Sequence, residues 1–71
     1  MHWNYRVVRK VVDGVETFGI HEAFYESRKD THPSITVDPV EPYGDSLEEL
    51  KDSLKRMKKA LKKPTIEFSG V

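Results

Sequence analysis

The chain has 71 residues and no cysteine, and its 12 Lys and Arg residues balance 12 Asp and Glu residues. This length predicts one small domain over residues 1–71, which buries only about 60% of the surface of the unfolded chain. The absence of cysteine excludes disulfides and thiolate metal sites, and the zero net charge argues against a protein that coats DNA over its whole surface. No apolar run approaches the roughly 20 residues that span a bilayer, so we expect a cytoplasmic protein without a signal peptide or a membrane contact.

Residues 3–12 and 15–25 predict two strands because both are rich in β-branched and aromatic side chains. Between them, Asp13-Gly14 favours a type I′ hairpin turn with positive φ at both residues. The register that pairs Val12 with Val15 gives the sheet one apolar and one mostly polar face. We expect the apolar face to carry Trp3, Tyr5, Val7, Val11, Phe18, Ile20 and Phe24. The second face then carries Asn4, Arg6, Val8, Lys10, Val12, Thr17, Gly19, His21 and Ala23.

The remaining strand signals are short. Residues 26–33 are polar and predict a loop, and residues 34–38 alternate in a way that indicates a third strand. Pro39 cannot donate to a strand ladder, so this strand lies at an edge or ends there. Residues 65–68 either form a last short strand or pack without one, and residues 69–71 are expected to fray.

Gly19 lies in the middle of the second predicted strand, where a glycine indicates a bulge or the close approach of another backbone.

The helix is the clearest predicted element. Ser46 and Glu49 form a capping box that begins it, and Pro64 ends it near Lys63. An apolar stripe at spacings of three and four follows the cap, formed by Leu47, Leu50, Leu54, Met57 and Leu61. We therefore predict an α+β fold in which a three-stranded antiparallel sheet, over about residues 3–38, is covered on its apolar face by one helix over about residues 46–63. Leu54 is then a core residue.

Positive charge gathers in the second half of this helix. Lys55, Lys59, Lys62 and Lys63 cluster roughly opposite the leucine stripe. One interpretation is an anion-binding face for nucleic acid or an acidic protein. The other is a solvated face, because lysines near the end of a helix and acids near its start stabilise the helix dipole. Both interpretations remain open at the level of sequence.

Catalytic and metal-binding patterns are weak. His21 and Glu22 are adjacent on a strand and therefore point to opposite faces, and we expect His21 to lie opposite Arg6. The acids Glu41, Asp45, Glu48 and Glu49 fit helix capping and solvation better than acid–base catalysis. The three histidines, His2, His21 and His32, lack metal-ligand spacing. We expect no enzyme, no metal, no cofactor and no small-molecule substrate, and structural roles for Asp13, Gly14, Gly19, Ser46 and Glu49.

Two features favour a macromolecular partner. A small three-stranded sheet leaves free edges, which proteins often cover by pairing with a second chain. Apolar residues on the second sheet face, namely Val8, Val12, Ala23 and Tyr25, form a modest patch. We expect a protein partner or a homodimer.

Three blocks of the sequence resemble a group of short, uncharacterised bacterial proteins: residues 3–10 (WNYRVVRK), 17–22 (TFGIHE) and 42–50 (PYGDSLEEL). More loosely, the segment Gly44-Asp45-Ser46-Leu47-Glu48-Glu49 is similar to the start of the helix in HicB-type antitoxin domains. That resemblance implies three antiparallel strands, a helix and a short strand, arranged like a truncated ribonuclease H fold without catalytic carboxylates, and it implies binding to a toxin protein. It supports the fold more than the function.

Together these patterns predict a small non-enzymatic binding or regulatory module that contacts another protein, in the manner of an antitoxin domain or as a homodimer. The competing prediction is nucleic-acid binding through the basic helix face.

Overall fold

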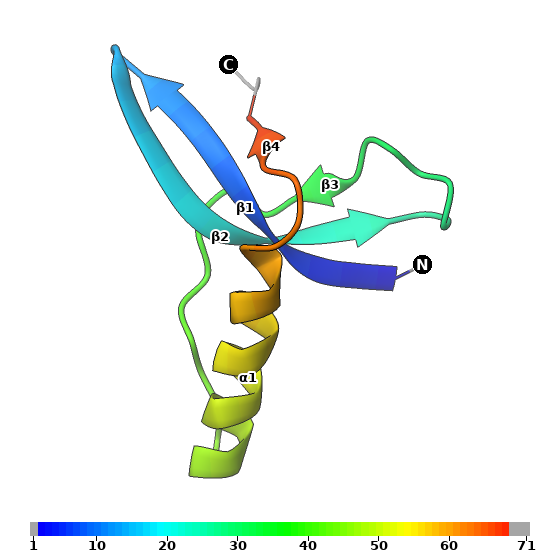
Figure 1. The fold of residues 1–71 in the computed structure, drawn as a ribbon, viewed down its shortest axis with the longest axis vertical. Coiled ribbons are helices and arrows are strands. Elements are labelled where there is room, and N and C mark those ends of the chain that lie inside the picture. Colours follow the sequence, from blue (N-terminus) through cyan, green and yellow to red (C-terminus); the bar gives the residue numbers. More distant parts are fainter. Residues whose placement is uncertain (1, 69–71) are drawn as a thin grey trace.

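The computed structural model describes residues 2–68, which form one four-stranded sheet and one helix. The elements in chain order are β1 (His2–Val12), β2 (Val15–Tyr25), β3 (Ser34–Ile35), α1 (Leu47–Ala60) and β4 (Ile66–Glu67). The sheet order is β3-β2-β1-β4, with β4 parallel to β1 and the other neighbours antiparallel (Figure 1). The fold is therefore α+β, as predicted, but the sheet is mixed and has four strands rather than three antiparallel ones.

The β1–β2 hairpin has the predicted register, from Val12 opposite Val15 to Trp3 opposite Phe24. At the turn, Asp13 has φ 51° and Gly14 has φ 79°, the left-handed values that a type I′ turn requires. The hairpin is the longest part of the sheet, because β3 and β4 each contain two residues. The third strand thus ends well before the predicted residue 38.

Arg9 is a charged residue on the sheet face that was expected to be apolar. Its Nε lies 2.5 Å from Glu16 Oε2 and its Nη1 lies 2.8 Å from Glu67 Oε2. These two carboxylates, Glu67 above all, raise the pKa of Arg9. The charge is thus paired across three strands, which joins β4 to the hairpin.

The second sheet face, expected to be mostly polar, holds four of the six buried residues of the described chain: Val8, His21, Ala23 and Tyr25. Ile66 pairs with Val8 and Ile35 pairs with Ala23, so the short outer strands add apolar side chains to this face. Several of its polar groups bond to one another: Arg6 Nη1 donates to Tyr25 Oη at 2.9 Å and Tyr25 Oη donates to Asn4 Oδ1 at 3.0 Å, while the buried Arg6 Nε has no partner among the described residues. Polar groups can be buried at little cost when they are paired. The alternation of the sequence did not reveal that these side chains pair with one another.

Gly19 lies on this second face beside the connector between β3 and α1. A Cβ atom placed on Gly19 would lie 3.1 Å from Pro39 Cβ, so the glycine allows a close approach. The neighbouring Val40 N–H donates to the carbonyl of Ile20 at 2.8 Å. The connector is therefore held against β2 as far as Val40.

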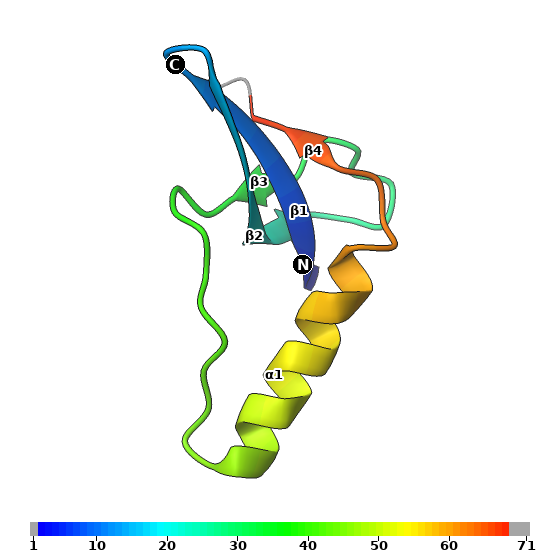
Figure 2. The same ribbon diagram turned by 60° about the vertical axis from the view of Figure 1, so that its left-hand side comes forward.

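The position of α1 corrects the expected packing. Only its C-terminal half reaches the sheet, where Met57 and Ala60 are buried, and its N-terminal half extends away from the strands (Figures 1 and 2). Leu54 is 48% exposed, so its prediction as a core residue was wrong, and Phe18 is 60% exposed on the face that the helix was expected to cover. The chain leaves β2 near Val40 and must return to the far side of β1 to form β4, which brings only the end of α1 onto the sheet.

The start of α1 has the expected cap. Ser46 Oγ accepts from the Glu49 N–H at 3.2 Å, while Glu49 Oε2 accepts from the Asp45 N–H at 3.0 Å. The helix ends at Ala60, three residues before the predicted end, and a turn follows to Lys63. Within residues 2–68, no helix combines the length and apolar character needed to cross a membrane.

Candidate functional site

Two leucines of α1 and the leucine at its C-cap form an exposed line that we call the leucine row: Leu47, Leu54 and Leu61. They are 65%, 48% and 69% exposed. Residues seven apart on a helix lie nearly above one another, so the row follows one side of α1 along its length. Met57, from the same predicted stripe, is buried against the sheet instead. The fold therefore uses one edge of the apolar stripe and leaves the other edge in solvent.

An apolar groove with a volume of about 470 Å³ lies beside the C-terminal half of the leucine row. The sheet supplies Ile20 to this groove, and the connector supplies Val40 and Pro42. The helix supplies the other wall with Leu54, Met57, Lys58 and Leu61. Exposed apolar side chains thus line both sides of a depression, and its only charged lining residue is Lys58.

The chain exposes more surface than a compact protein of its size. Its accessible surface is 5775 Å², whereas a compact monomer of 8.2 kDa exposes about 4,500 Å². Its radius of gyration is 12.9 Å, against about 11 Å for a compact chain of this length. The excess of about 1,200 Å² exceeds the roughly 800 Å² that one partner buries in a standard protein interface. Leu47, Leu54 and Leu61 are among the large apolar side chains that this extended shape leaves exposed.

The predicted lysine cluster is divided between two surfaces. Lys55, Lys59 and Lys62 lie together with Lys58 around a shallow depression on the outer side of α1. Lys63 instead lines a different pocket, and Lys59 stands at the boundary and contributes to both. The four lysines therefore border two adjoining depressions, which Lys59 connects.

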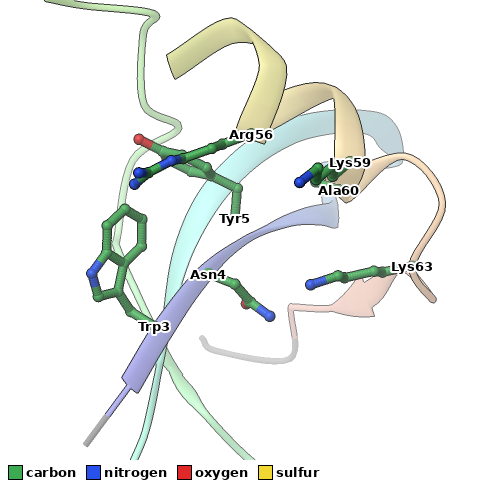
Figure 3. Close-up of a pocket in the computed structure, with 7 residues that line it drawn as sticks. All are labelled: Trp3, Asn4, Tyr5, Arg56, Lys59, Ala60 and Lys63. Atoms are coloured by element: carbon green, nitrogen blue, oxygen red, sulfur yellow. The ribbon is translucent and has the colours of Figure 1, made fainter. Parts of the chain in front are cut away.

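The pocket beside Lys63 combines basic and aromatic side chains, and we call it the aromatic–basic pocket. Arg56 and Lys59 reach it from α1, Lys63 reaches it from the turn after α1, and Trp3, Asn4 and Tyr5 reach it from β1 (Figure 3). Buried Ala60 lies between the two groups. Sequence reasoning missed this site because about 60 residues separate Trp3 from Lys63. The spacing of Trp3 and Tyr5 on one strand face and the basic end of α1 were its only signals.

His21 is buried, with 1% of its surface exposed, on the second sheet face. Its Nδ1 lies 2.9 Å from the carbonyl oxygen of Thr36, which can only accept, so Nδ1 carries the proton of this hydrogen bond. Arg6 lies opposite His21 in the strand register, as expected. The bond to Thr36 holds the connector on the sheet, which gives His21 a structural role.

The acidic candidates do not converge. Asp45 and Glu49 are engaged around the helix cap, and Tyr43 Oη donates to Asp45 Oδ1 at 3.0 Å. In the described part of the chain, no three His, Asp or Glu side chains form a group that can hold a metal ion. Asp45 and Glu49 therefore have a structural role at the start of α1.

Comparisons with protein-family models, with curated proteins and with solved structures gave no match to this chain.

Proposed function

We propose that this chain is a non-enzymatic interaction module that works as a homodimer, in which the leucine rows of two copies pack against each other. The excess exposed surface carries the proposal. A chain that leaves about 1,200 Å² more surface in solvent than a compact monomer, and that exposes Leu47, Leu54 and Leu61, gains most by burying these side chains against another chain.

The spacing of the leucine row favours a second copy as the partner. Leu54 lies midway between Leu47 and Leu61, seven residues from each. In an antiparallel pair of helices related by a twofold axis, Leu54 meets Leu54 of the second copy and Leu47 meets Leu61. Leu47 of one copy is then placed near the apolar groove of the other, whose helical wall ends at Leu61.

Charge also supports this orientation. The first turn of α1 carries Glu48 and Glu49, and its last turn carries Lys58 and Lys59. Antiparallel pairing brings the acidic end of each helix toward the basic end of the other, whereas parallel pairing would bring like charges together. The chain has no net charge, so no global repulsion opposes association.

A regulatory role of the HicB antitoxin kind is the biological context we propose for the dimer. The element order β-β-β-α-β is the order that the resemblance of residues 44–49 implies. The proposed second partner is a toxin protein, bound by surfaces that the helix pair leaves free. A stoichiometric second chain that co-purifies with the module from its source cells would test this context separately from dimerisation.

Sedimentation equilibrium tests the dimer. The wild-type chain should sediment with about 16 kDa, twice its chain mass of 8.2 kDa, at concentrations of tens of micromolar. Leu47→Glu should return it to the monomer mass while its circular dichroism stays unchanged, because Leu47 is 65% exposed. Val12→Glu is the matched control, since Val12 is 62% exposed at the hairpin end and lies outside the proposed interface. A wild-type mass near 8 kDa at high concentration would refute the proposal.

A further inference from the structure

We propose that the aromatic–basic pocket binds one nucleotide unit of a single-stranded nucleic acid, with the base stacked on Trp3 and the phosphate held by Lys59 and Lys63. The pocket combines the two features that single-strand recognition uses, an aromatic platform and a cationic wall. The inference is independent of the proposed homodimer, since different residues carry it.

The aromatic platform is rigid and accessible. The rings of Trp3 and Tyr5 meet edge to face, with centroids 5.1 Å apart and an interplanar angle of 88°. Tyr5 thereby restrains the indole ring, while 43% of Trp3 remains exposed. An indole that is held in place but half exposed can stack with a base at little entropic cost.

The cationic wall is available to a ligand. Arg56 Nε is 3.1 Å from Asp52 Oδ2 and is therefore partly neutralised. Within residues 2–68, neither Lys59 nor Lys63 forms an ion pair, and no carboxylate lines the pocket. In Figure 3 the side chains of Lys59 and Lys63 extend from the helix side toward the space above Asn4, and Trp3 lies across that space, below Arg56. Two unpaired ammonium groups on one side of the pocket and an indole on the other match the phosphate and the base of one nucleotide unit.

The size of the pocket narrows the ligand class. The pocket volume is about 240 Å³, close to the lower end of small-molecule sites, so it accommodates one nucleotide unit rather than a larger group. Asn4 lines the pocket from the second sheet face, where its Oδ1 accepts from Tyr25 Oη, so the base is recognised by stacking on Trp3 alone. Stacking on an aromatic ring tolerates any base, so oligothymidylate is the probe we choose for an unpaired strand.

The leucine row lies on a different side of α1. At about 100° per residue, Arg56 and Lys59 point roughly opposite to Leu54. Pairing of two copies through the leucine row therefore leaves the aromatic–basic pocket open in each copy. Loss of the dimer and loss of nucleotide binding can be measured separately.

Intrinsic fluorescence provides a local readout, because Trp3 is the only tryptophan in the chain. Adding oligothymidylate of about 12 nucleotides to the full chain in about 50 mM salt should quench Trp3 to saturation, and the affinity should fall steeply by about 300 mM salt. A duplex of the same length and a polyglutamate chain should produce weaker quenching, since neither offers an unstacked base. Equal quenching by the duplex, or by polyglutamate, would overturn the proposal.

Matched charge variants locate the site. Lys63→Ala should weaken binding severalfold more than Lys62→Ala, because Lys62 carries the same charge but does not line the pocket. With a labelled oligonucleotide, Trp3→Ala should weaken binding about fivefold or more, while Trp3→Phe should retain most of it. Unchanged circular dichroism verifies that each variant folds. Equal effects of Lys62→Ala and Lys63→Ala, or no quenching by oligothymidylate at low salt, would overturn the proposal.

Discussion

Gly44 packs directly on the backbone of Leu50, at the point where the connector joins the first turn of α1. A Cβ atom on Gly44 would overlap the Leu50 nitrogen, and backbone cannot swing aside as a flexible side chain can. The contact fixes the direction in which α1 leaves the connector. Since α1 touches the sheet only through its C-terminal half, this direction also determines where the leucine row points.

Gly44→Ala should therefore destabilise the chain by about 1–3 kcal/mol through overpacking. Urea unfolding followed by circular dichroism measures the change in the free energy of unfolding. Gly14→Asn is the control, because a Cβ atom at Gly14 meets nothing within 4 Å and asparagine tolerates its φ of 79°. A loss in Gly44→Ala no larger than that in Gly14→Asn would show that the overlap relaxes freely.

Lys58→Glu should strengthen the dimer. Lys51 and Lys58 lie on the same flank of the leucine row, and antiparallel pairing about Leu54 brings Lys51 of one copy near Lys58 of the other. At about 100° per residue, Lys51 lies about 60° from the leucine row, whereas Glu48 and Glu49 lie about 120° and 140° from it, so Lys51 is the nearest of these charges to Lys58 of the other copy. The substitution replaces these two repulsive pairs with two attractive ones, so the dissociation constant should fall severalfold in low salt. Sedimentation velocity over a dilution series measures the dissociation constant, and Lys55→Glu serves as a control with the same charge change. A weaker dimer in Lys58→Glu than in Lys55→Glu would argue against the antiparallel arrangement.

Asp30 should make the loop between β2 and β3 sensitive to acid. The N–H groups of Glu26 and His32 donate to the Asp30 carboxylate at 3.1 and 2.9 Å, and these bonds, that of Glu26 first, lower the pKa of Asp30 below its usual 3.8. A lowered pKa in the folded state stabilises the loop above about pH 4, and this contribution is lost as the pH falls through the folded value. Amide NMR signals of residues 26–32 should shift below pH 4 in the wild type. In Asp30→Asn they should not shift, and identical titrations of the two proteins would contradict the assignment.

Local sequence rules predicted the elements of this fold well. The positive-φ dipeptide Asp13-Gly14 set the hairpin register along all of β1 and β2, because a two-residue turn leaves only one pairing. Ser46 and Glu49 marked the start of the helix for a similar reason, since capping depends on residues only three apart. These features needed no knowledge of the remaining chain.

Longer-range features could not be predicted in the same way. An apolar stripe predicts that its leucines are buried, but it does not distinguish burial in the core of the same chain from burial against a second chain. Leu54 was therefore assigned to the core, although its side chain is half exposed. A two-residue strand such as β4 carries no periodic pattern, and its parallel pairing with β1 depends on the whole path of the chain. The approach of Trp3 to Lys63 across the helix–strand contact depends on that same path.

The most direct test of the central claim is disulfide formation in Leu54→Cys. The chain has no native cysteine, so the substituted thiol can bond only to its copy in a second chain. Helices about 8–10 Å apart place facing Cα atoms within the roughly 4.4–6.8 Å that a disulfide bridges. Mild oxidation of Leu54→Cys at micromolar concentration should convert most of the protein to a covalent dimer, and Val12→Cys should form little under the same conditions. Equal, slow crosslinking of both variants would contradict the pairing of the leucine rows.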